Sequence, residues 1–127
     1  MAYTAEVWTT PITVAETQSF LRQAHDVWSD DEREAFIDFI ARNPEAGDII
    51  RDGGRVRKVR WGRHGRGKRG GVRVIYFFHD LETPLYLLLV YAKAVRTDLS
   101  PDAKKAVREF AERIKQARRR TAGRRNR

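Results

Sequence analysis

The segment that decides the fold is RVRKVRWGRHGRGKRGGVRVIYFF, residues 55–78. It holds two runs rich in valine, isoleucine and aromatic residues, which are typical of β-strands, joined by a link of glycine and basic residues. Lys58, Arg60 and Arg73 fall inside the two strand-like runs. Because positive charge on a sheet adds little to folding, this pattern suggests that an anionic ligand lies across the hairpin.

The segments on either side complete an order of strand, two helices, three strands and helix. The expected strands are 4–9, 56–62, 72–79 and 85–93, with a glycine-rich link at 63–71, and the expected helices are 14–27, 29–42 and 101–116. This order predicts a compact α+β domain with an N-terminal strand, a two-helix hairpin, a three-stranded antiparallel meander and a C-terminal helix. We expect the helices to cover one face of the sheet. Residues 1–116 should form this domain and residues 117–127 a disordered basic tail.

Capping signals mark the expected helix starts. Thr13 with Glu16, and Ser29 with Glu32, match the capping box, in which a hydroxyl and a carboxylate satisfy free amides of the first turn. Ser100 followed by a proline supplies an N-cap and a first-turn proline for the last helix.

The charge of the chain is large and unevenly distributed. The 127 residues carry a net charge of +9, which favours an acidic partner such as nucleic acid, an anionic membrane or an acidic protein. Residues 1–50 have a net charge of −7, residues 51–73 of +9 and residues 74–127 of +7. The cations therefore gather in the quoted segment and at the C-terminus.

The composition excludes several classes of protein. Without cysteine there is no disulfide framework, thiolate metal site or cysteine nucleophile. The longest apolar run, residues 85–92, is far shorter than the roughly 20 residues of a membrane helix, and the N-terminus has no signal-peptide pattern. We expect a cytoplasmic protein that has no membrane partner.

Alternation along the strands predicts where the cations point. Lys58 and Arg60 share one face while Val59 and Trp61 share the other, so the first pair is exposed if the second packs on the helices. Arg73 interrupts an apolar run, where it is costly unless its guanidinium is paired or reaches an anion-binding concavity. The alternative, that these cations only solvate a face or protect an edge, is disfavoured by their dense clustering.

Other motifs carry weaker signals. The link lacks the G-x-x-x-x-G-K-[ST] pattern and precedes a strand, which argues against a nucleotide triphosphatase. The three histidines lack metal-binding spacing, and the three tryptophans fit core positions better than base-stacking ones. The carboxylates of residues 30–38 fit a solvated helix face better than an acid–base pair.

The order of elements and three stretches together resemble the RelE/HigB family of toxins from bacterial type II toxin–antitoxin systems, most closely its HigB-like branch. The stretches are VRKVRW, GRGKRGGVRVIYFF, and PLYLLLVYAK followed by DLSP, within residues 56–101. Members of this family are ribosome-dependent endoribonucleases that cut messenger RNA in the 30S decoding site, amid ribosomal RNA, with no cofactor. The resemblance implies attack of a ribose 2′-OH on the adjacent phosphate, leaving a 2′,3′-cyclic phosphate and a 5′-OH.

The resemblance also implies roles for individual residues. Arg73 matches the arginine that binds the scissile phosphate, Lys58 and Arg60 match paired basic residues of the preceding strand, and Lys93 matches a lysine typical of the HigB-like branch. These four are the expected catalytic residues. The expected RNA-binding residues are Arg57, Arg63, His64, Arg66, Lys68 and Arg69, and no metal ligand is expected.

The resemblance to the family is incomplete for the residues that transfer protons. RelE-type relatives have an arginine near Ala94 and a catalytic tyrosine in the C-terminal segment, but residues 97–127 contain no tyrosine. The proton carrier therefore stays open, with Lys93 and His64 as candidates. The resemblance further implies a helix-turn-helix antitoxin as partner. The alternatives to an active toxin are a non-catalytic RNA- or DNA-binding module on the same fold, and a protein-interaction module or decayed toxin.

Overall fold

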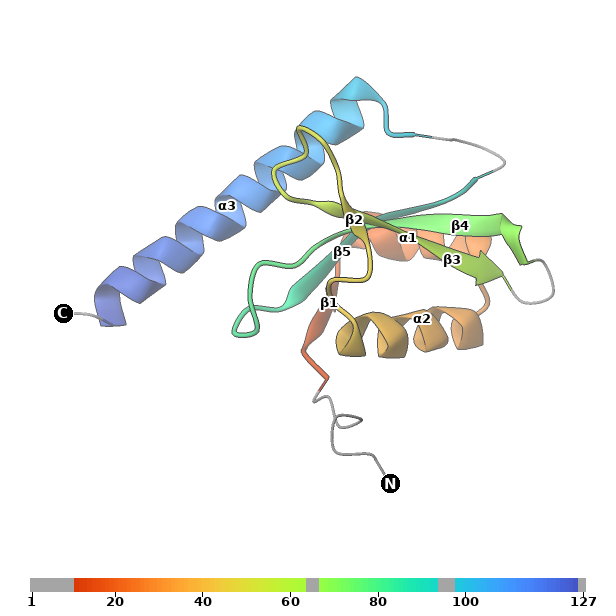
Figure 1. Ribbon diagram of the computed structural model, residues 1–127, viewed down its shortest axis with the longest axis horizontal. Helices are drawn as coiled ribbons and strands as arrows, with labels where there is room; N and C mark the ends of the chain where they lie inside the picture. The colour runs from red at the N-terminus through yellow and green to blue at the C-terminus, as the bar shows by residue number, and fades with distance from the viewer. Residues whose placement is uncertain (1–10, 64–66, 94–97, 126–127) are drawn as a thin grey trace.

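The fold is a five-stranded mixed sheet with helices on both of its faces (Figure 1). The computed structural model describes residues 11–63, 67–93 and 98–125. Its elements are β1 (Val14–Glu16), α1 (Gln18–Val27), α2 (Asp30–Arg42), β2 (Asp48–Ile49), β3 (Arg57–Arg63), β4 (Gly67–Phe77), β5 (Leu85–Ala92) and α3 (Pro101–Arg125). The strand order is β1-β5-β4-β3-β2. The predicted α+β class is confirmed.

The antiparallel meander predicted from the sequence is the centre of this sheet. β3 pairs with β4 and β4 with β5, both antiparallel. Two short strands were missed at the edges. β1 lies parallel to β5, and β2 pairs two residues with β3. Neither is long enough to show an alternating pattern in the sequence.

The central strand β4 is buried on both faces. Val72, Val74 and Tyr76 belong to the core formed with α1 and α2. Ile75 and Phe77 belong to a second core, to which α3 contributes residues such as Val107 and Ala111. The prediction that all helices cover one face is therefore wrong. A nearly continuous apolar strand, rather than an alternating one, needs cover on both sides.

Two of the three predicted helix starts are confirmed. Ser29 and Glu32 form the capping box of α2, and the Ser100 hydroxyl accepts a hydrogen bond from the Ala103 amide at the start of α3. The predicted start of α1 is wrong, because residues 14–16 form β1 and the N-cap is Thr17. Parallel pairing with the distant β5 overrides the local capping signal.

The structure also differs from the sequence prediction at the link and the tail. β4 begins at Gly67, within the predicted link, and α3 continues to Arg125, beyond the predicted start of a disordered tail at residue 117. Arg118 supports this extension because its guanidinium binds Asp80 and Glu82 in the β4–β5 turn. The strand predicted at 4–9 lies outside the described residues. None of the described helices is both long and apolar enough to cross a membrane.

Candidate active site

The three strand cations line one cavity. This cavity, of about 740 Å³, lies against β3 and takes further residues from β2 and β4. Lys58, Arg60 and Arg73 all contribute to its wall. The structure therefore brings together three of the four side chains that the sequence predicts to be catalytic.

The pairing of β3 with β4 explains why these cations converge. Arg60 and Arg73 are direct cross-strand partners, and residues directly opposite each other project from the same face. Lys58 lies two residues before Arg60 and shares that face. Val59 and Trp61 pack on the opposite side, against the α1–α2 core. The predicted division of the β3 faces is confirmed.

Arg73 is the most buried of the three cations, with only 6% of its surface exposed. In the described part of the chain, its guanidinium makes one hydrogen bond, from Nη1 to the Val72 carbonyl at 3.5 Å, and no ion pair. Burying a cation without a counter-ion is costly. An anion bound in the cavity would offset this cost.

Lys58 makes a weak contact with Asp98, which precedes α3. Its Nζ lies 3.8 Å from a carboxylate oxygen of Asp98, the same oxygen that accepts the Leu99 amide. Both side chains are substantially exposed, so solvent screens this pair and it contributes little to stability. The ammonium can turn from Asp98 to a bound anion at small cost.

The remaining predicted site residues have different positions. Lys93 is exposed just after β5, where its amide binds the Gly71 carbonyl, and it is not among the described lining residues of the cavity. Arg57 alternates away from Lys58 and donates to the Gly47 carbonyl at 2.7 Å, so it has a structural contact on the other face. The others lie on β3 or β4 with side chains that the structure does not describe (Arg63, Lys68 and Arg69), or outside the described residues (His64 and Arg66).

One charged lining residue was missed by the sequence prediction. Asp48 of β2 lies directly opposite Lys58 and adds a carboxylate to the cationic wall. A strand of two residues gives no periodic signal, so nothing in the sequence placed Asp48 beside the basic strands.

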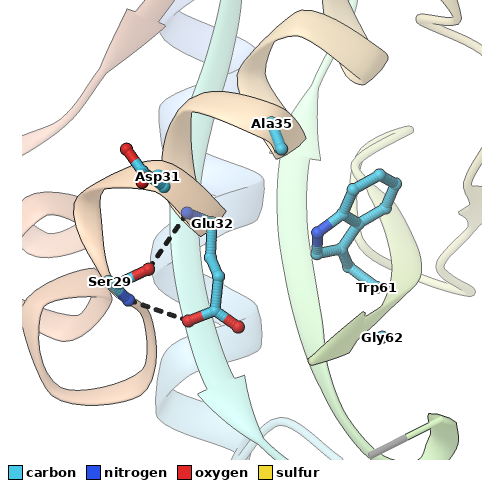
Figure 2. Close-up of a pocket in the computed structure, with 6 residues that line it drawn as sticks. All are labelled: Ser29, Asp31, Glu32, Ala35, Trp61 and Gly62. Carbon is cyan, nitrogen blue, oxygen red and sulfur yellow. Dashed lines mark hydrogen bonds between the residues drawn. The ribbon is translucent and has the colours of Figure 1, made fainter. Parts of the chain in front are cut away.

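A second cavity, of about 690 Å³, adjoins the first because Trp61 and Gly62 line both. Figure 2 shows Glu32 of its wall hydrogen-bonded to Ser29 within the capping box, across from the indole of Trp61. The Trp61 ring also packs against Phe36 and Phe39, with centroids 5.4 and 4.9 Å away, which agrees with its predicted core position. Because carboxylates line this second cavity, it is unsuited to phosphate.

The fold and the cavity together define a small α+β protein with a cavity on its sheet that Lys58, Arg60 and Arg73 line. A family model described as the RelE toxin of the RelE/RelB toxin–antitoxin system matches residues 13–123. The chain belongs to the RelE toxin family and is thus the toxin of a toxin–antitoxin system, with an antitoxin as its partner. The predicted resemblance to RelE toxins is confirmed, and the match does not test the assignment to the HigB-like branch.

Proposed function

We propose that this toxin is a ribosome-dependent endoribonuclease that cleaves translated messenger RNA in the 30S decoding site and so inhibits translation. The observation that carries the proposal is the buried Arg73, which has no ion pair with any described residue and lies beside Arg60 and Lys58 in one cavity. A polynucleotide phosphate is an anion that could enter this cavity from solvent. The family's association with toxicity supports RNA as the source of that phosphate.

The proposed reaction is attack of a ribose 2′-oxygen on the neighbouring phosphorus. Negative charge grows on the non-bridging oxygens as the pentavalent transition state forms, and fixed cations in a partly dry site stabilise that charge more than they stabilise the ground state. We assign this role to Arg73 and Arg60, because they are adjacent across the ladder. The described residues contain no group of three metal-ligating side chains, and the proposed reaction uses no metal.

The finer assignments concern binding and partnership. We propose that Lys93 and the basic residues Arg57, Arg63, His64, Arg66, Lys68 and Arg69 contact RNA around the cleaved bond, where each neutralised phosphate releases counterions. We also propose that the chain falls in the HigB-like branch, with a helix-turn-helix protein as antitoxin. The RNA contact of Arg57 requires it to exchange its bond to Gly47 for one to phosphate.

Cleavage of a defined message on purified translating ribosomes tests this function. The expected products carry a 2′,3′-cyclic phosphate and a 5′-OH, and they do not form when the 2′-OH at the cleaved position is replaced by hydrogen. RNA binding without any new 5′ end would favour the non-catalytic module instead. Cleavage of free RNA at the same rate would contradict the dependence on the ribosome.

A further inference from the structure

We propose that Asp48 is the general base, which removes the proton from the attacking 2′-hydroxyl. This assignment rests on the proposed endoribonuclease function and fills the role left open by the absence of a C-terminal tyrosine. It starts from the position of Asp48 in the cationic cavity, opposite Lys58.

A carboxylate is an unexpected component of a phosphate site. Asp48 is the only acidic side chain among the described residues that line this cavity. Two unit charges of the same sign 4 Å apart repel by about 1 kcal/mol even in water, and by more where solvent is partly excluded. A site that served only to bind phosphate would bind it more tightly without Asp48. A carboxylate in this position therefore indicates a role other than phosphate binding.

The backbone before Asp48 is fixed by a buried tyrosine. The amide of Gly47 donates to the Tyr76 hydroxyl at 2.9 Å, and that hydroxyl donates to the Pro44 carbonyl at 2.7 Å. Burial raises the pKa of Tyr76 above its ordinary value, so the hydroxyl keeps the proton that it donates. These bonds fix the start of β2 without using the Asp48 side chain.

Close packing at Gly47 fixes β2 further. A Cβ at this position would lie 2.9 Å from the Lys58 carbonyl oxygen and 2.9 Å from a ring carbon of Tyr76. The strand therefore approaches β3 more closely than a larger residue would permit. As a result, the backbone of β2 is held at a fixed distance from β3.

The Asp48 carboxylate itself makes no hydrogen bond or ion pair with any residue in the described part of the chain. It is a side chain with acceptor capacity that the fold does not use. The lysine ammonium and arginine guanidinium groups of the cavity have no lone pair with which to accept a proton. Among the described lining side chains, the carboxylate is thus the natural base.

The reaction then balances within the cavity. Asp48 takes the proton from the 2′-OH, the 2′-oxygen forms a bond to phosphorus, and the bond from phosphorus to the 5′-oxygen breaks. The Lys58 ammonium gives a proton to the departing 5′-oxygen, while Arg60 and Arg73 bind the non-bridging oxygens. Exchange with solvent afterwards returns the proton from Asp48 to Lys58.

The test is single-turnover cleavage by Asp48→Asn on translating ribosomes, together with binding of a message whose 2′-OH is replaced by hydrogen at the cleaved position. We expect the cleavage rate at saturation to fall at least about 100-fold, because general bases contribute about 10²- to 10⁴-fold. Affinity for the deoxy message should be unchanged or tighter, because a repulsive charge is removed. The melting temperature should be unchanged.

Two results would overturn this assignment: a loss of less than about 100-fold, or a loss of deoxy-message affinity as large as that of Arg73→Ala. Asp52→Asn makes the same change four residues away, outside the described cavity lining, and should cleave like the unmodified protein. Failure of the proposed function looks different, because the unmodified protein would then leave the message intact. If only the assignment of Asp48 is wrong, the unmodified protein still cleaves the message.

Discussion

Arg60 lies directly opposite Arg73 in the ladder that joins β3 to β4. Like charges in direct cross-strand positions destabilise a sheet, and the low exposure of Arg73 adds a desolvation cost. The pair therefore opposes folding while the cavity holds no anion. A phosphate between the two guanidinium groups would reverse the sign of this contribution. Functional sites commonly contain arrangements that lower the stability of the protein.

Replacing Arg73 by alanine should lower the cleavage rate without lowering the stability of the protein. We expect the cleavage rate on ribosomes to fall by about 10²- to 10³-fold, the usual effect of removing one group that stabilises a developing oxyanion. The free energy of unfolding should be unchanged or higher, because one of two repelling cations is gone and no described ion pair is lost with it. Urea unfolding followed by circular dichroism measures the second quantity.

Arg22→Ala is the matched control for this substitution. Arg22 is exposed on α1, where its guanidinium donates a hydrogen bond to the Ser19 hydroxyl in the same helix, far in sequence from the cavity. Its removal should change neither the cleavage rate nor the free energy of unfolding appreciably. Cleavage by Arg73→Ala at the unmodified rate would show that the scissile phosphate lies elsewhere.

A small anion should stabilise the protein through this pair. Inorganic phosphate that binds only the folded state adds about 2.7 kcal/mol to the free energy of unfolding at 100 times its dissociation constant. Phosphate also stabilises proteins generally by exclusion from their surface. The informative quantity is therefore the rise in melting temperature of the unmodified protein minus that of Arg73→Ala, at equal ionic strength. We expect a positive difference, and a difference of zero would contradict anion binding at Arg73.

The features that could be predicted are those that depend on residues close together in the sequence. The alternation of Lys58 and Arg60 with Val59 and Trp61 identified the exposed face of β3, and the capping box at Ser29 identified the start of α2. Each of these signals needs only residues within about four positions of one another. Local physical chemistry was sufficient for them.

The parts that could not be predicted depend on contacts distant in sequence. β1 forms because Val14 pairs with Leu85, and Asp48 enters the cavity because β2 pairs with Lys58. The placement of α3 on the second face follows from two-sided burial of β4, which becomes visible once the sheet order is known. The extension of α3 past residue 117 involves Arg118 and the turn at Asp80, 38 residues earlier.

Removing the Tyr76 hydroxyl should weaken the anchor of β2. Tyr76→Phe leaves the buried Gly47 amide without its acceptor and the Pro44 carbonyl without its donor. An unsatisfied buried group costs about 1–3 kcal/mol, so we expect the free energy of unfolding to fall by that amount. Tyr86→Phe is the matched control, because the Tyr86 hydroxyl has no hydrogen bond to the described residues. An equal loss in both variants would argue against a specific role of the Gly47–Tyr76 bond.

The carboxylate of Asp80 should make stability depend on acid pH. Burial alone would raise its pKa, but hydrogen bonds from the Thr83 hydroxyl, the Glu82 amide and the Arg118 guanidinium outweigh that effect and hold the pKa below its ordinary 3.8. A carboxyl group whose pKa is lowered by folding contributes stability above its unfolded value. That contribution is lost as the pH falls through the lower, folded value.

Asp80→Asn should therefore be less stable than the unmodified protein at pH 7, by at most about 1 kcal/mol because the group is partly exposed. The difference should stay constant down to about pH 5 and shrink below pH 3.8 as the unmodified protein loses the same interactions. Urea unfolding at several values between pH 3 and pH 7 measures it. Asp26→Asn, on the exposed side of α1, should leave the free energy of unfolding at pH 7 unchanged. A difference between Asp80→Asn and the unmodified protein that persists undiminished at pH 3 would contradict the link to ionisation, since the carboxyl would then act through packing alone.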